Sequence, residues 1–171
     1  MAVRRILTYG DPRLEAENAP VARFDSELDA VVVDLFETSW AAPGLGLAAP
    51  QVGVNLRLAV IDLSVGRDPD QRLVLANPEI VWQEGRVSQE EGCLSFPSLY
   101  TTIARPRRLR VQFQDHHGEP RALEADGLLA QALCHELDHL EGRLLVHHLR
   151  GMKKSLFLRR VEKMRSLGVW R

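Results

Sequence analysis

Two histidines four positions apart constrain this chain more than any other feature of its sequence. His135 and His139 bound the segment HELDH, inside an apolar-periodic run over about residues 126–141. In an α-helix, residues at i and i+4 share one face about one turn apart, so both imidazoles can reach one metal ion. Glu136 projects beside that face, where a carboxylate can act as a base on water held by the metal. A coincidental HExxH on a solvated helix is the alternative.

The other side of this predicted helix is apolar. Its leucines fall away from the mean direction of the two histidines: Leu129, Leu133, Leu137 and Leu140. We therefore expect one side of the helix to pack into a core while the other side binds. Cys134 also points away from the histidine face, which indicates packing rather than metal ligation. Two adjacent histidine pairs have diverging side chains and are expected on loops or at the surface: His116 with His117, and His147 with His148.

Two histidines leave a catalytic metal site incomplete, since such a site usually has three protein ligands and one open position. Leu145 stands where the pattern HExxHxxGxxH would place a third histidine, and Glu162 lies in a strongly basic segment that favours an intrahelical ion pair. Cys93 in EEGCLS is the better candidate, because a thiolate is a strong ligand and Gly92 allows close backbone approach. A buried structural cysteine is the alternative interpretation of Cys93.

The order of the predicted elements defines the fold class. A helix from Asp25 or Ser26 to about Trp40 comes first, and helices over about 126–141 and 152–167 come last. Between them, apolar and β-branched segments separated by turn residues such as Asn77-Pro78 predict antiparallel strands at 56–63, 72–76, 79–83, 100–104, 109–115 and 121–125. This order predicts an α+β fold, with antiparallel sheets packed around the central HExxH helix. The 171 residues suit a single domain, 1–171.

A glycine-rich segment at 44–51, GLGLAAPQ, is the third candidate element of a site. It lacks the lysine and hydroxyl residue of a phosphate-binding loop, and it lies in an uncharged stretch that we read as a buried, irregular loop. Its glycines would let a substrate backbone lie against the chain, and Gln51 could donate a hydrogen bond to a developing oxyanion. An ordinary turn is an equally good interpretation of the segment taken alone.

Charge and cysteine content exclude several classes of protein. The chain has 22 basic and 23 acidic residues and a net charge of -1, which argues against a dedicated nucleic-acid-binding protein, and we expect no DNA partner. The two cysteines cannot form a disulfide framework and the N-terminus lacks a secretory apolar run, so we expect a cytoplasmic protein. The uncharged stretch 38–56 contains prolines and glycines, and we do not expect it to cross a membrane.

The small net charge hides an asymmetry along the chain. Residues 150–171 carry eight basic side chains and one acid, Glu162, so the rest of the chain is acidic. A solvated helix face explains this pattern, and an anionic partner is the alternative explanation.

Three segments together resemble a known family. GLGLAAPQ (44–51), EGCLS (91–95) and HELDH (135–139) have the order and spacing of the signature motifs of bacterial-type, short-form peptide deformylases, and the resemblance covers essentially the whole chain. It implies that Cys93, His135 and His139 hold one divalent metal ion, with water in the fourth position. The family usually uses Fe2+ in the cell, while Zn2+, Ni2+ or Co2+ can substitute, and the ligand types alone do not choose among them.

The resemblance also implies a reaction. The enzyme would remove the N-formyl group from the N-terminal methionine of newly synthesised proteins and release formate. Glu136 would act as general base and then as general acid for the attack of metal-activated water on the formyl carbon. The Gln51 amide and the backbone N–H of Leu94 would stabilise negative charge on the formyl oxygen.

Substrate contacts are implied in the same way. The peptide would bind by strand addition. The residues expected to contact it are Gly44, Leu45, Gly46, Gly92, Tyr100, Leu128, Gln131 and Ala132. Leu128 and Ala132 would line an apolar pocket for the methionine side chain. The sequence departs from the family pattern at Cys134, where a glutamine is frequent, and at Ser98, where a glycine is frequent. Cys134 lies on the back of the helix and should matter little, whereas Ser98 together with Tyr100 leaves the shape of the substrate rim open.

Three other functions compete with this one. A metallopeptidase with Glu162 as third ligand would cleave internal peptide bonds, a structural metal site would suit a ribosome-associated binding module, and a relative of the family could be inactive. The C-terminal helix of bacterial relatives is associated with ribosome binding, so the ribosome is the anionic partner that the resemblance suggests for the basic segment.

Overall fold

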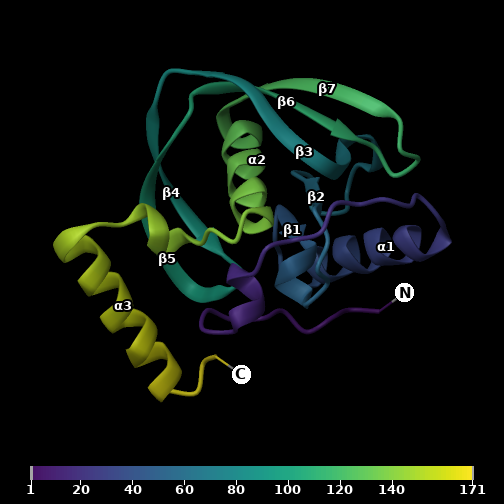
Figure 1. Cartoon of the computed structure of the whole chain (residues 1–171). Helices are drawn as coiled ribbons and strands as arrows, with labels where there is room; N and C mark the ends of the chain where they lie inside the picture. Colours follow the sequence, from purple (N-terminus) through teal and green to yellow (C-terminus); the bar gives the residue numbers. More distant parts are fainter. Residues whose placement is uncertain (1, 171) are drawn as a thin grey trace.

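Two antiparallel sheets and three α-helices make up the computed structural model, which describes residues 2–170 (Figure 1). The larger sheet has the strand order β1-β2-β3-β6-β7, and β4 pairs with β5 in the smaller sheet. The strands are β1 (Gly46–Ala48), β2 (Leu58–Asp62), β3 (Arg72–Glu84), β4 (Val87–Cys93), β5 (Phe96–Arg105), β6 (Arg108–Gln114) and β7 (Pro120–Asp126). Short 3-10 helices lie at Pro12–Glu15, Ala49–Val52, Pro69–Gln71 and Leu145–His148, and the second and third of these join strands. This arrangement confirms the predicted α+β class.

The helix α2 (Gly127–Leu140) carries HELDH and lies between the two sheets (Figure 1). Leu133 and Leu137 pack against Ile61, Leu75 and Leu109 of the larger sheet. Burial of this apolar side stabilises the protein by about 2 kcal/mol for each large side chain. The opposite side carries the two histidines, so the predicted division of the helix into a packing side and a binding side is confirmed.

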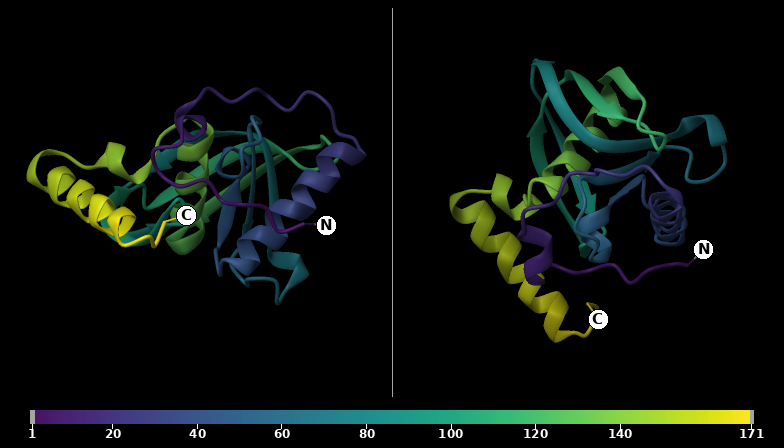
Figure 2. Two further views of the ribbon diagram at one scale, coloured as in Figure 1. Left: turned by 90° about the horizontal axis from the view of Figure 1, so that it is seen from below. Right: turned by 45° about the vertical axis from the view of Figure 1, so that its right-hand side comes forward.

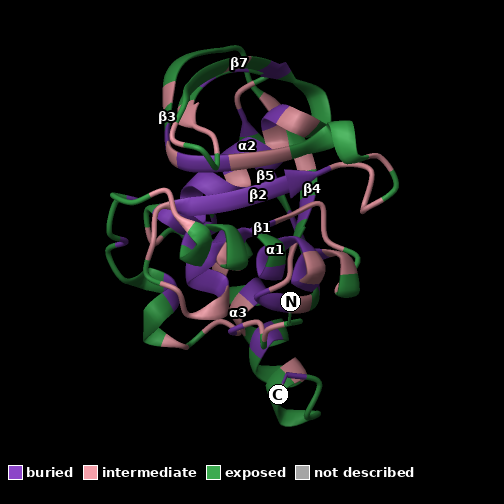
Figure 3. Ribbon diagram, turned by 90° about the vertical axis from the view of Figure 1, so that its right-hand side faces the viewer, coloured by how far each residue is buried: buried purple, intermediate pink, exposed green. Residues whose placement is uncertain are grey.

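The helix α1 (Ser26–Ala41) begins at a well-formed cap and covers β1 and β2. The Asp25 side chain accepts hydrogen bonds from the backbone N–H groups of Glu27 and Leu28, as the predicted start requires. Leu35 and Phe36 pack with Leu58 and other residues of the sheet. Figure 3 shows β2 as buried along its whole length, because α1 lies on one of its faces and α2 on the other.

The helix α3 (Gly151–Ser166) is less peripheral than its charge pattern suggests. Phe157 and Val161 are buried in a core cluster with Phe96 and Trp170, while the basic side chains on its outer face are exposed. Leu156, next to Phe157 on the same helix, is exposed. Figure 2 shows the helix lying along the outside of the molecule, with the chain turning back from its end. None of the described helices is long and apolar enough to span a membrane.

Three local predictions were wrong. Asn77-Pro78 is not a turn between two strands but a bulge within β3, where Asn77 takes a φ of 51° and bonds Val21 and Gln114 through its side chain. β4 was missed, because its charged sequence VSQEEGC does not read as a strand. Segment 44–51 is not an irregular loop, since Gly46–Ala48 forms strand β1 in register with β2.

Candidate active site

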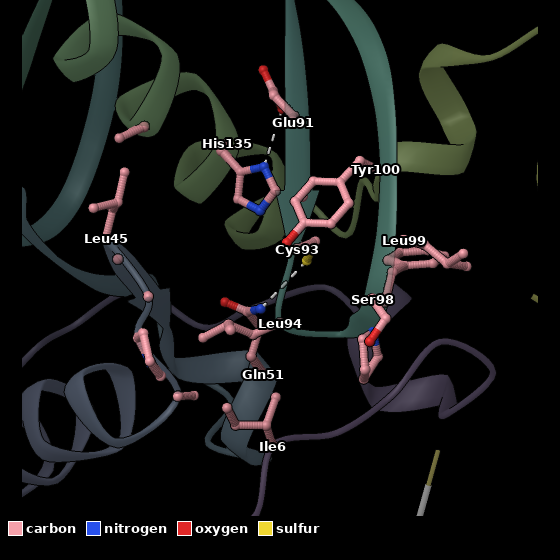
Figure 4. A pocket seen from close by; sticks show the side chains of 18 of the residues that line it. Ile6, Leu45, Gln51, Glu91, Cys93, Leu94, Ser98, Leu99, Tyr100 and His135 are labelled. Carbon is pink, nitrogen blue, oxygen red and sulfur yellow. Dashed lines mark hydrogen bonds and ion pairs between the residues drawn. The ribbon is translucent and has the colours of Figure 1, made fainter. Parts of the chain in front are cut away.

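Three side chains from two elements meet at the centre of the molecule. Cys93 ends β4, and His135 and His139 project from neighbouring turns of α2. Their ligand atoms all lie within 4.8 Å of one another, and the Cys93 Sγ is 3.2 Å from the His139 Nε2. Figure 4 shows Cys93 and His135 facing the same cavity. Glu162, the alternative third ligand, is exposed on α3 and is not part of this group.

The charge state of this group suits metal binding. Burial raises the pKa of the Cys93 thiol, but the adjacent His139 and His135 outweigh that effect and hold the pKa well below its ordinary value. The cysteine is therefore poised as a thiolate, which is the form that binds metal. One thiolate and two imidazoles within reach of one point match the donor set of a tetrahedral site with one open position.

A buried ion-pair network orients His135, and sequence reasoning missed it. The Glu91 Oε2 accepts a hydrogen bond from His135 Nδ1 at 3.2 Å, so the other ring nitrogen, Nε2, is the one that could bind a metal beside Cys93. Arg105 on β5 donates to both oxygens of Glu91, at 2.8 and 2.9 Å, and to Asp138 Oδ2 on α2 at 2.6 Å. Asp138 also contacts His148. The network therefore ties the smaller sheet to the metal-site helix.

Arg105 lies outside the three motifs, and Asp138 lies within HELDH but was assigned no role. The two residues meet only when β5 pairs with β4 and α2 packs between the sheets. The one sequence clue was Glu91 itself, a carboxylate two positions before the candidate ligand cysteine. Burial alone would raise the pKa of Glu91, but hydrogen bonds from Arg105 and His135 lower it to about 2. Glu91 is therefore ionised, and it lies where a metal-binding histidine usually has a carboxylate partner.

We expect Glu91→Gln to weaken metal binding about 10- to 100-fold, because the amide cannot hold the His135 ring as an ionised carboxylate does. The measurement is a metal titration of the apo protein. Glu90→Gln is the matched control, since Glu90 is the exposed neighbour of Glu91 on the same strand. Equal affinities of the two variants would contradict this role of Glu91.

The same variant also tests the pKa of Glu91. When folding lowers the pKa of a carboxyl group, its ionised form stabilises the folded protein at any pH above the pKa of the unfolded state. This contribution is lost as the pH falls from the unfolded-state pKa to the folded-state pKa. The folded pKa is about 2 and the unfolded pKa is about 4.3, so the stability difference between wild type and Glu91→Gln should shrink between about pH 5 and pH 2. Urea unfolding at several pH values measures it.

Glu136 is the acid of the site, and its carboxyl group is buried. The residue is 4% exposed, and its Oε2 has no hydrogen-bond partner among the described residues. Burial raises its pKa to about 7, which is near the value that an acid–base catalyst needs at neutral pH. A Cβ at Gly46 would come within 2.7 Å of the Glu136 Oε1, so only glycine lets β1 lie this close to the acid.

Gln51 is oriented by bonds to its amide oxygen and nitrogen. Its Oε1 accepts a hydrogen bond from Ala48 N at 2.9 Å, which turns its Nε2 toward Ser95 Oγ at 3.2 Å and Cys93 Sγ at 3.7 Å (Figure 4). The amide N–H groups therefore point at Cys93 in the candidate metal-binding group, which consists of Cys93, His135 and His139. Leu94 follows Cys93 directly and lines the same cavity.

A cavity of about 990 Å³ opens beside this group. The structure brings the residues expected to contact substrate to its wall: Gly44, Leu45, Gly46, Gly92, Tyr100, Leu128, Gln131 and Ala132. Gln51, Cys93, His135 and Glu136 line it as well, whereas His139 lies behind them and is buried. Ser98, which was expected to affect the substrate rim, lines the cavity, as do Ile6 and Val169, which were not among the predicted contacts. The cavity therefore extends well beyond the metal-binding group.

The two sides of the cavity are strand edges. β1 is the edge strand of the larger sheet, and β4 pairs only with β5 in the smaller sheet. Figure 4 places Leu45 on one side of the cavity and Cys93 with Tyr100 on the other. A Cβ at Gly92 would come within 2.7 Å of the Tyr100 ring, so a side chain at this position would displace the ring that lies over β4. Both edges are thus accessible to an extended peptide.

The remaining predicted positions behave as packing or surface residues. Cys134 is buried on the far side of α2, and burial raises its pKa to about 11, so it is a neutral thiol. His116 and His117 are exposed in the turn before β7. His147 and His148 lie at the surface as expected, although His148 also joins the buried network through Asp138.

An acid whose pKa lies near neutrality, placed beside a group that can hold a metal ion, is suited to taking a proton from water. The fold and the site therefore define a metal-dependent hydrolase. Comparisons with known proteins place it more closely. Residues 3–155 match the polypeptide deformylase family, and the chain belongs to this family, whose members remove the N-formyl group from newly synthesised peptides.

Relatives of known sequence and structure agree with this assignment. The chain is 44% identical to the peptide deformylase of Acidobacterium capsulatum, in an alignment that covers 99% of this chain and 100% of that protein. A crystal structure of a peptide deformylase from Legionella pneumophila superposes with a TM-score of 0.93 at 40% identity, covering 99% of each chain. The enzyme from Thermus thermophilus gives a TM-score of 0.86 at 40% identity, covering 96% of this chain and 95% of that one.

Proposed function

We propose that this chain, as a single domain over residues 1–171, deformylates the N-terminal methionine of nascent peptides in the cytoplasm, with Glu136 as the acid–base catalyst. The observation that carries the proposal is the buried Glu136 carboxyl group, which has a raised pKa and an Oε2 with no hydrogen-bond partner among residues 2–170. It supplies a proton acceptor next to the cysteine and histidine group. No other described cluster of histidine, cysteine and acidic side chains could hold a metal ion.

Cys93, His135 and His139 would hold one divalent ion, which we propose is Fe2+ in the cell, with Zn2+, Ni2+ or Co2+ able to substitute. A bound ion would lower the pKa of water and polarise the formyl oxygen. The donor set supports this assignment, because one thiolate with two imidazoles suits these borderline metals and leaves a coordination position open.

The chain's own residues would handle the protons and the developing charge. Glu136 would take a proton from the attacking water and deliver it to the departing amine, which a pKa of about 7 favours in both directions. The Gln51 Nε2, already held toward Cys93, would donate to the formyl oxygen together with the backbone N–H of Leu94. Because Oε1 of Gln51 is fixed by Ala48, the donor is oriented before substrate arrives.

The peptide would bind as an added strand between the two sheet edges. Gly44, Leu45 and Gly46 would pair with it on one side and the backbone near Gly92 on the other. The methionine side chain would enter the part of the cavity lined by Leu128 and Ala132 of α2. Gln131 borders this pocket and is held by a hydrogen bond to the backbone oxygen of Glu90, and Tyr100 covers the rim.

A formate-release assay tests the proposed function. The protein is purified anaerobically, its metal content is measured, and formate is assayed with formyl-Met-Ala-Ser. We expect turnover that stops when a chelator removes the metal, and weaker turnover of formyl-Gly-Ala-Ser, which leaves the apolar pocket empty. An absence of formate with every divalent metal tried would refute the proposal.

The ribosome is the further partner that we propose, through the basic outer face of α3. The side chains of Arg159, Arg160 and Lys163 are exposed there, while the opposite face of the helix is buried. We expect co-sedimentation with ribosomes that weakens steeply with added salt, because contacts to RNA phosphates release counterions. Binding that does not change with salt would contradict this surface. Removing the whole helix is not a clean test, since it would expose the core around Phe96.

A further inference from the structure

The last described residues of the chain form part of the wall of the substrate cavity. After α3 ends, Gly168 takes a φ of 68° and the chain reverses direction (Figure 2). The reversal is closed by backbone hydrogen bonds from Gly168 N to Arg165 O at 3.0 Å and from Val169 N to Met164 O at 3.2 Å. Gly168 and Val169 then line the same cavity as Cys93, His135 and Glu136. A segment remote in sequence from every motif thus reaches the site.

Trp170 anchors this segment to the start of β5, a few residues after Cys93. It is 9% exposed, its Nε1 donates to the Pro97 backbone oxygen at 3.0 Å, and its ring meets the Phe96 ring edge-on at 5.9 Å between centroids. The Arg165 guanidinium lies 5.5 Å from the centroids of both the Trp170 and the Tyr9 rings. Such contacts with aromatic faces are attractive. The tail is therefore fixed at its end.

The anchor leaves one side chain available to a ligand. Val169 is 45% exposed and lines the cavity, between the reversal at Gly168 and the buried Trp170. Leu167, two positions earlier, is 64% exposed but does not line the cavity. Val169 lines the cavity and Leu167 does not, because the chain reverses direction at Gly168 between them. Val169 is consequently an apolar surface presented to whatever occupies the cavity beyond the metal-binding group.

We propose that Val169 is a specificity-determining residue that contacts the substrate side chains following formyl-methionine. The inference rests on the proposed function, because it assumes that the formyl group lies at Glu136 and the methionine side chain beside Ala132. The remainder of the peptide then leaves through the rest of the cavity, whose wall includes Pro97 and Val169. An apolar wall at this point favours peptides with apolar side chains after the methionine, because their contact surface leaves water.

A charge placed at position 169 gives a sharp test. Val169→Asp adds a carboxylate to the wall, whereas Leu167→Asp adds the same charge two residues away and outside the cavity. The readout is the ratio of kcat/KM for formyl-Met-Lys-Lys to that for formyl-Met-Glu-Glu, measured with metal-loaded protein at low salt. Each peptide carries the same residue at both positions after methionine, so the test does not depend on which of these two positions contacts Val169.

We expect Val169→Asp to raise this ratio about 5- to 10-fold, and to lower kcat/KM for formyl-Met-Leu-Leu, through attraction and repulsion that added salt weakens. Leu167→Asp should change the ratio less than about 2-fold, because exposed charges farther from the peptide are screened. Formyl-methioninamide, which has no residues beyond methionine, should be hydrolysed equally by both variants and by wild type.

Two outcomes would overturn the inference. One is an unchanged ratio in Val169→Asp, and the other is an equal change in Leu167→Asp, which would indicate a general field rather than contact. Failure of the proposed function looks different, since wild-type protein would then release no formate from formyl-methioninamide or any peptide. Because Val169 is half exposed, the variant should unfold at the wild-type temperature, which a thermal melt checks.

Discussion

Glu136→Gln is expected to lower the rate of formate release about 10³-fold while leaving the metal content unchanged. The glutamine keeps the size and shape of the side chain but can no longer accept a proton from water or pass one to the departing amine. The Glu136 carboxyl group does not belong to the group of potential ligands, so metal binding should persist. The measurements are kcat for formyl-Met-Ala-Ser and metal per protein by elemental analysis.

Two further variants frame this result. Glu136→Asp keeps the acid but withdraws it by one methylene, and it should be intermediate in rate. Glu141→Gln removes an exposed carboxylate at the end of the same helix and should be fully active. A Glu136→Gln enzyme with near wild-type rate would mean that another group moves the proton. A variant that lost its metal would mean that Glu136 supports the ligands instead.

The pH dependence of the rate belongs to the same argument. Burial raises the pKa of Glu136 to about 7, so the base form needed for proton transfer from water is lost as the pH falls below about that value. In Glu136→Gln this dependence should disappear from the residual rate. The hydrogen-bonded network at Glu91 and Arg105 stays ionised over the same range, because the pKa of Glu91 is about 2 and that of Arg105 is raised.

The part of the site that could be predicted from the sequence is the part that depends on the spacing of residues within one helix. His135 and His139 must share a face once the segment is helical, and the leucines on the other side make it helical by packing. Gly46 was expected to let a substrate backbone approach and Gly92 to allow close backbone approach, and the structure shows that the side chains of Glu136 and Tyr100 lie against them. The shared face of the two histidines depends on their spacing along the chain, and the close contacts depend on the small size of glycine. Both properties are visible in a sequence.

The features that were missed depend on which distant elements become neighbours. β4 was missed because its sequence is charged. Its Glu91 is buried only because it pairs with Arg105, and neither residue type is typical of a protein core. Asn77 was predicted to lie in a turn. Its side chain instead forms hydrogen bonds with the backbone N–H and C=O of Val21, and β3 continues through a bulge at this position. Val169 reaches the cavity only because Gly168 reverses the chain. Tertiary contacts decide each of these cases.

Cys93→Ser is the second substitution with a large expected effect, since it should abolish both metal binding and formate release. A serine hydroxyl stays protonated near neutral pH and is a poor ligand for borderline metals, whereas the pKa of the Cys93 thiol is held low by His139 and His135. Loss of an outer partner of a ligand weakens metal binding about 10- to 100-fold, and loss of the ligand itself should exceed that range. A metal titration followed by a formate assay measures both effects.

Cys134→Ser is the matched control for this prediction. It makes the same chemical change on the same helix as the histidines, but Cys134 is buried on the far side of α2 as a neutral thiol. Its variant should lose some stability and keep its metal and its rate. The comparison also separates deformylation from the metallopeptidase alternative, in which Glu162 is the third ligand. That alternative requires Cys93→Ser to keep its metal. The structure opposes it, because Glu162 is exposed on α3, whereas the Cys93 Sγ lies 3.2 Å from the His139 Nε2.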